Sequence, residues 1–179
     1  MRLALPALLI PAILPTQALA APSPMFDIFQ RVCLDTHGEP AAVGALTEDW
    51  TVVDDLPAPL LRSLGGPFDK VTSRTKPTTS DEEYMLVSGV HAADQRHTCT
   101  LTGPGDPEAS AATRQWVGDL KPILGGGDSV SYLILDTPAG RRAPTPEEAN
   151  DAKNASRLTS VTVSTQLDVT LLSLSAFGH

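Results

Sequence analysis

Three side chains of types that commonly bind metal ions lie close together in this sequence: His91, His97 and Cys99. Imidazole nitrogens and a thiolate are the usual ligands of zinc. A metal site requires that such groups converge in space. The elements that carry the three residues therefore decide whether they act together.

The residues around these candidates predict a β-hairpin. Segments 84–91 and 96–102 are rich in strand-forming residues, and the short polar connection 92–95 joins them. With a symmetric turn, the predicted pairs are His91 with Arg96, Val90 with His97, and Ser88 with Cys99. Side chains alternate between the two faces of a strand, so the two histidines are expected to point in opposite directions. The sequence therefore predicts no metal site and implies no cofactor.

Cys33 and Cys99 are the two cysteines of the chain. In an exported protein, the simplest arrangement is one intrachain disulfide between them. Two free thiols, or thiols paired between chains, are the alternative. A disulfide would leave no thiolate for a metal.

His97 is the one candidate catalytic residue. It falls on the strand face that carries Cys99, which is the face expected to be buried. It could act as a general base that activates a serine such as Ser88 or Ser160. A structural histidine with a hydrogen-bond partner is the simpler interpretation, because nothing in the sequence fixes the geometry of a nucleophile and its base.

Two further motifs match known sites only in part. Ser73 and Lys76 have the S-x-x-K spacing of penicillin-recognising enzymes, but that chemistry needs a helix, and Pro77 disfavours one at Lys76. The glycines at 125–127 lack the remaining residues of a phosphate-binding loop and are predicted to be a flexible connector. Neither motif indicates a site.

The first twenty residues have the pattern of a secretory signal peptide. Arg2 is followed by an apolar run at 3–14 and by Ala18, Leu19 and Ala20, which form a small-x-small cleavage site. We expect cleavage after Ala20 by the Sec pathway and one periplasmic or secreted domain at 21–179. The apolar run is too short to span a bilayer, so no membrane anchor is expected after cleavage.

The charge of the chain restricts its partners. The 21 acidic and 13 basic residues give a net charge of −8, and loss of Arg2 makes it about −9. Nucleic acid and anionic membranes attract basic surfaces, so neither is an expected partner. An envelope protein or a small molecule remains as the expected partner.

Both helices and strands are predicted to position these residues. The predicted helices are 24–34, a short one after Pro40, 106–121 and 145–153; the predicted strands are 50–53, 68–73, 84–91, 96–102 and 130–135. Residues 54–80 are otherwise expected to be irregular, with 75–80 exposed. Residues 158–174 alternate with period two and form one strand or a hairpin. This predicts an α+β fold with an antiparallel sheet packed by helices.

Residues 29–36, Gly38 and 40–43, with Trp50 beyond them, resemble the N-terminal part of a group of small exported proteobacterial proteins. In that group an early helix carries a cysteine, and a second cysteine lies in a mid-chain strand, as Cys99 does here. The resemblance covers about a sixth of the chain. It implies a periplasmic location, and because the group is one of uncharacterised function it transfers no catalytic residues.

These observations favour a non-enzymatic exported domain that binds another molecule. A small hydrolase that uses His97 as its base is the alternative, and an envelope structural protein is a third. An enzyme should have a deep pocket in which His97 meets a hydroxyl or carboxylate, whereas a binding module should have a shallow patch or groove. Trp50 and Trp116 are both expected to lie largely in the core.

Overall fold

A nine-stranded antiparallel sheet is the main element of this computed structural model, which describes residues 21–56, 61, 68–151 and 158–177. The strand order is β1-β2-β3-β4-β9-β8-β6-β5, and β7 pairs with β6. The strands are β1 (Thr51–Val53), β2 (Lys70–Pro77), β3 (Glu83–His91), β4 (Arg96–Pro104), β5 (Leu124–Gly126), β6 (Ser129–Thr137), β7 (Gly140–Arg142), β8 (Leu158–Gln166) and β9 (Val169–Phe177). The predicted signal peptide, residues 1–20, lies outside the described residues.

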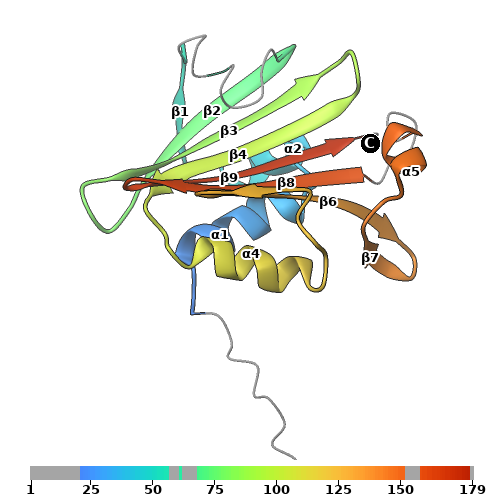
Figure 1. Cartoon of the computed structure of the whole chain (residues 1–179). Coiled ribbons are helices and arrows are strands. Elements are labelled where there is room, and N and C mark those ends of the chain that lie inside the picture. The colour runs from blue at the N-terminus through green and yellow to red at the C-terminus, as the bar shows by residue number, and fades with distance from the viewer. Residues whose placement is uncertain (1–20, 57–60, 62–67, 152–157, 178–179) are drawn as a thin grey trace, which may run out of the picture.

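Helices cover one face of this sheet. They are α1 (Pro24–Phe29), the π-helical turn η1 (Gln30–Leu34), α2 (Pro40–Leu46) and α4 (Ala109–Val117). The short helix α5 (Pro146–Asp151) lies at the end of the sheet beside β7 in Figure 1. In Figure 1, α1 and α4 lie side by side under the sheet, and α1 contacts β4 while α4 contacts β8. The predicted α+β class, with helices packed on an antiparallel sheet, is confirmed.

The predicted hairpin has the predicted register. Ser88 pairs with Cys99, Val90 with His97, and His91 with Arg96. Cys99 points toward the helices, where it forms the predicted disulfide with Cys33 of η1, at a Cα–Cα distance of 5.5 Å. This bond defines a helix-facing side of β4, and the intervening residues of the strand lie on the opposite side.

The core lies between the helices and this side of the sheet. Phe29, Cys33 and Cys99 are fully buried there, beside Leu101 and Leu174 of neighbouring strands. Phe29 and Cys33 are four residues apart, so one helical stripe carries both into the core. The helical segment 24–34 was predicted correctly, but its second half is a π-helical turn and not a regular α-helix.

α4 begins at Ala109, after an N-cap at Glu108, and not at the predicted residue 106. Asp106 lies before this helix start. Its carboxylate accepts hydrogen bonds from Ser23 Oγ (2.8 Å), from the backbone N–H of Met25 (3.3 Å) and from that of Glu108 (3.1 Å). The Asp106 carboxylate thus accepts hydrogen bonds near the N-terminal ends of both α1 and α4, where the helix dipole favours negative charge.

The end of α4 also differs from its prediction. The helix stops at Val117 and not at residue 121. Gly118 follows with φ +69° and ψ −132°, a conformation open to glycine but rarely adopted by residues with a side chain. The predicted end at residue 121 was based on Pro122, which lies beyond the observed end.

Two segments predicted to be irregular form strands. β2 continues to Pro77, so residues 75–77 are part of the sheet and not of an exposed loop. Residues Gly125 and Gly126 lie in the edge strand β5, paired with Val130 and Ser129. Ladder hydrogen bonds need only backbone groups, so a strand forms here without strand-forming side chains. Parts of the predicted irregular region, 57–60 and 62–67, lie outside the described residues.

The alternating segment 158–174 is a hairpin of two strands. β8 and β9 pair from Leu158 with Phe177 to Gln166 with Val169, and only Leu167 and Asp168 form the turn. The sequence alternation places Leu167 within a strand. In the structure its side chain is 98% exposed and its φ is positive, at 52°. Leucine is uncommon in such a turn, and this made the turn hard to recognise.

α5 begins with a capping box formed by Thr145 and Glu148, and this feature leads to a testable pH dependence. The Glu148 carboxylate accepts from the Thr145 backbone N–H, and Thr145 Oγ1 accepts from the Glu148 N–H. Hydrogen bonding to Arg142 is the main cause that lowers the pKa of Glu148, with Thr145 next, to about 2.

This lowered pKa predicts that acid weakens α5. A carboxyl with a lowered pKa stabilises the folded state fully above its usual pKa of 4.5, and that contribution falls as pH drops toward 2. The protection factors of the α5 amides, which NMR gives after division by the intrinsic exchange rates, should therefore fall over this range. Glu148→Gln should remove the pH dependence, and an unchanged pH response in that variant would contradict the assignment.

Candidate functional site

His97, the residue predicted as a candidate base, is partly buried on the helix-facing side of β4. It lies against the loop between η1 and α2, where Gly38 packs beside Cys99 and His97. Glu39 follows in this loop, and His97 is one of the groups that lower its pKa. The larger causes are the backbone N–H groups of Ala42 and Ala41.

The two serines considered as nucleophiles lie on different faces of the sheet. Ser88 is buried on the helix-facing side, two residues before Val90, the register partner of His97. Thr159 pairs with Ala176, the β9 partner of His97, so its neighbour Ser160 points to the opposite face. The structure therefore excludes Ser160 as a partner of His97.

The Glu39 carboxylate caps the N-terminal end of α2. Its carboxylate oxygens accept hydrogen bonds from the backbone N–H groups of Ala41 (3.1 Å) and Ala42 (2.7 Å). These are the groups that a helix N-cap satisfies, so the carboxylate is engaged in starting α2. Its hydrogen bonds orient it toward the helix end.

His91, the other histidine of the hairpin, lies on the face away from the helices. It is 6% exposed, and its ring is 4.7 Å from that of Phe68, measured between centroids. The two histidines thus occupy opposite faces, as the register predicted. Within the part of the chain that the structure describes, no three histidine, cysteine, aspartate or glutamate side chains converge in a way that could hold a metal ion.

The S-x-x-K motif lies in β2, where Ser73 and Lys76 point to opposite faces of an extended strand. Lys76 instead forms an ion pair with Asp49, with its Nζ 3.0 Å from the carboxylate. The interpretation of this motif as a chance match is consistent with that geometry, since the helical stacking of serine and lysine is not formed.

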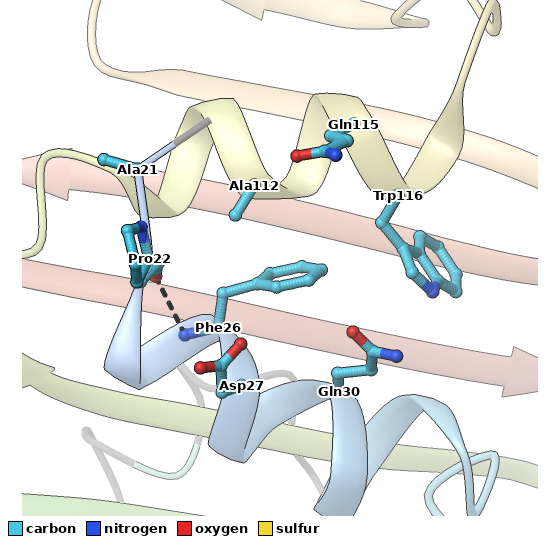
Figure 2. Close-up of a pocket in the computed structure, with 9 residues that line it drawn as sticks. Ala21, Pro22, Phe26, Asp27, Gln30, Ala112, Gln115 and Trp116 are labelled. Atoms are coloured by element: carbon cyan, nitrogen blue, oxygen red, sulfur yellow. Dashed lines mark hydrogen bonds between the residues drawn. The ribbon is translucent and has the colours of Figure 1, made fainter. Parts of the chain in front are cut away.

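A hollow lined by several polar side chains lies elsewhere, between α1 and α4. Figure 2 shows the Phe26 ring between the two helices, Asp27 and Gln30 rising from the α1 side, and Gln115 and Trp116 on the α4 side. The hollow has a volume of about 340 Å³. Its lining residues are Ala21, Pro22, Ser23, Phe26, Asp27, Gln30, Ala112, Gln115 and Trp116.

A second hollow of about 380 Å³ lies on the other side of Trp116. Its floor is apolar, and its rim carries charged groups from the η1–α2 loop and from the β6–β7 hairpin. Its lining residues are Leu34, Asp35, His37, Trp116, Asp136, Arg141, Thr159 and Leu174. Trp116 belongs to both hollows, and we call the two together the Trp116 groove.

Arg141 holds the indole of Trp116 in place. Its guanidinium lies 3.9 Å from the centroid of the Trp116 ring, and its Nη1 donates to the Trp116 backbone carbonyl at 3.2 Å. Its Nε is 3.5 Å from the carboxylate of Asp136, which is its register partner across the β6–β7 hairpin. Arg141 therefore connects the β6–β7 hairpin to α4 and orients the Trp116 indole, in part through the cation–π contact.

The backbone beside the groove has two unusual conformations. η1 is a π-helical turn, closed by the Asp35 N–H donating to the Gln30 carbonyl at 2.9 Å. His37, two residues further on, has a positive φ of 51°. π-helical turns and left-handed residues other than glycine are rare and are enriched at functional sites. Gln30, Asp35 and His37 all line the groove.

The charges of the groove favour one class of ligand. Asp27, Asp35 and Asp136 contribute three carboxylates, against the single guanidinium of Arg141, which already contacts Asp136. The amides of Gln30 and Gln115 can both donate and accept hydrogen bonds. The groove is thus suited to hydrogen-bond donors such as hydroxyl and ammonium groups, and it disfavours anions.

Sequence analysis missed this groove and misplaced one of its central residues. Trp50 is 5% exposed and lies in the core as predicted, whereas Trp116 is only partly buried and lines both hollows. The helical period of α4 placed Trp116 on the same face as Val117 and Leu120. The early end of the helix at Val117 leaves the indole at the margin of that face.

Comparisons with known proteins add no template for this site. Among the described residues, no helix combines the length and the apolar composition that a membrane crossing requires. Searches found no matching family model, no similar curated protein and no similar solved structure. Function is therefore inferred from the chain's own residues.

Proposed function

We propose that this protein is a non-enzymatic extracytoplasmic binding domain whose ligand site is the Trp116 groove. The observation that carries the proposal is the placement of Trp116 between two hollows whose rims bear carboxylate and amide groups. Their volumes, about 340 and 380 Å³, each reach the range of small-molecule sites. The Cys33–Cys99 disulfide and the signal peptide predicted at residues 1–20 support an oxidising location outside the cytoplasm.

The proposed ligand is a small polar molecule that is neutral or cationic. Three carboxylates with one partly neutralised guanidinium repel an anion and attract an ammonium group. A polyol satisfies the same carboxylates and amides through its hydroxyl groups. The exposed part of the indole offers an apolar surface against which the carbon skeleton of either ligand can pack.

The test is an NMR titration of the mature protein, residues 21–179, with three probes: spermidine, a neutral disaccharide and citrate. We expect chemical-shift changes at the Trp116 indole N–H and at the side-chain amides of Gln30 and Gln115 with spermidine or the disaccharide. Citrate should cause none. Gln115→Ala should weaken binding about fivefold, the value of one hydrogen bond, because Gln115 is exposed and its loss leaves the fold intact.

Ile123→Ala is the matched control. Ile123 is 53% exposed and lies outside the lining of both hollows, so its replacement should leave binding unchanged. Shifts that map away from the groove, binding of citrate in preference to the other probes, or no binding of any probe at millimolar concentration would each contradict the proposal.

A further inference from the structure

The tip of the β8–β9 hairpin carries a leucine that is unfavourable for the isolated chain in two ways. Leu167 is 98% exposed, so its side chain gains nothing from burial. Its φ of 52° places it in the left-handed region, which costs an L-residue other than glycine about 1–2 kcal/mol. Glycine or asparagine would relieve the strain, and asparagine would also suit the solvent.

The surroundings of Leu167 extend this apolar tip. Val169, at the start of β9, is 53% exposed. A hollow of about 430 Å³ opens beside the turn. Its lining residues are Glu82, Pro104, Gly105, Pro107, Thr165, Leu167 and Asp168.

The end of the sheet that carries this tip is acidic. The turns at 78–83, 104–108, 127–129 and 165–169 meet there, because the strands β2, β4, β5 and β8 all end on this side and β3, β6 and β9 begin there. These turns contain no lysine and no arginine. Their acidic residues are Asp81, Glu82, Glu83, Asp106, Glu108, Asp128 and Asp168.

We propose that this acidic end is a docking surface for a partner protein that receives Leu167 in an apolar pocket with lysine or arginine at its rim. A leucine that is both strained and exposed in the isolated chain is explained if it is buried in a complex, where a few buried anchors supply most of the affinity. The carboxylates accelerate encounter with a basic partner. They also repel an anionic lipid surface, so a membrane is not the proposed partner.

The first experiment places a photo-crosslinking amino acid at position 167 of the full chain, in cells that naturally make the protein. The matched control places it at Ala93, in the exposed β3–β4 turn at the opposite end of the sheet. One dominant protein adduct at 167 that is absent at 93 is the expected result. The same adducts at both positions, a lipid adduct, an adduct with a second copy of this chain, or no adduct would overturn the proposal.

The second experiment uses the crosslinked partner in purified form. Leu167→Gly should weaken its binding at least tenfold, because it removes a buried anchor. The same change should leave the melting temperature of the free protein unchanged or raise it by about 2 °C, because glycine accepts a positive φ. Tight binding by this variant, or a lower melting temperature, would refute the role of Leu167.

A double variant tests whether the acidic residues around Leu167 attract a basic partner. Glu82→Gln combined with Asp168→Asn should slow association about tenfold and reduce its dependence on salt, while leaving the dissociation rate nearly unchanged. An association rate equal to that of the wild-type protein at low salt would overturn the assignment of a basic rim.

Discussion

Replacement of both cysteines, Cys33→Ala with Cys99→Ala, is expected to lower the free energy of unfolding by about 4 kcal/mol. The disulfide closes a loop across 66 positions of sequence, and opening a loop of this length restores a large conformational entropy to the unfolded chain. Both sulfurs are fully buried, so alanine also leaves small cavities. Urea unfolding followed by circular dichroism measures the loss.

The reduced wild-type protein is the control for this prediction. It should lose a similar amount of stability, because it has the same sequence but the open loop. A double variant as stable as the oxidised protein would contradict the role of the bond. The same variant should also bind groove ligands more weakly, since the disulfide fixes η1, and Gln30 and Leu34 of η1 line the groove.

Replacement of Phe29 by alanine is expected to cost about 3–5 kcal/mol of unfolding free energy. Phe29 is 0% exposed and lies one helical turn before Cys33, under the centre of the sheet. Truncation removes the buried apolar area of a whole ring and leaves a cavity that rigid neighbours cannot fill. Thermal unfolding of the oxidised proteins gives the difference.

Leu46→Ala is the control for this second prediction. Leu46 is 44% exposed at the end of α2, so its truncation should cost less than about 1 kcal/mol. Equal losses for Phe29→Ala and Leu46→Ala would show that the buried stripe of α1 and η1 is not the main helix-to-sheet contact. The two proposed sites, the Trp116 groove and the Leu167 tip, both depend on this core for their geometry.

The sequence alone determined the local pairings of this protein. The turn at 92–95 fixes the β3–β4 register, because side-chain alternation leaves only one way to bury Leu86, Cys99 and Leu101 together. The same reasoning placed His91 and His97 on opposite faces. Helical periodicity identified α1, Pro40 marked the start of α2, and a capping box marked the start of α5, since these signals involve residues close in sequence.

Weak local signals explain the errors of sequence analysis. β5 is made of Leu124, Gly125 and Gly126, and it exists because β6 offers it a ladder of backbone groups. Leu167 occupies a turn that sequence rules reserve for glycine or asparagine. In both places tertiary pairing overrides the preference of the residues themselves.

The candidate site was decided by tertiary structure only. The Trp116 groove joins segments 21–37, 112–116 and 136–141 with Thr159 and Leu174 of the sheet. These residues are distant in sequence and come together because the helices pack on one side of the sheet. A hollow forms where packed elements leave space, and no residue pattern within one element specifies that space. Local chemistry therefore determined the strands, the helices and the disulfide, whereas the packing of distant elements determined where a ligand can bind.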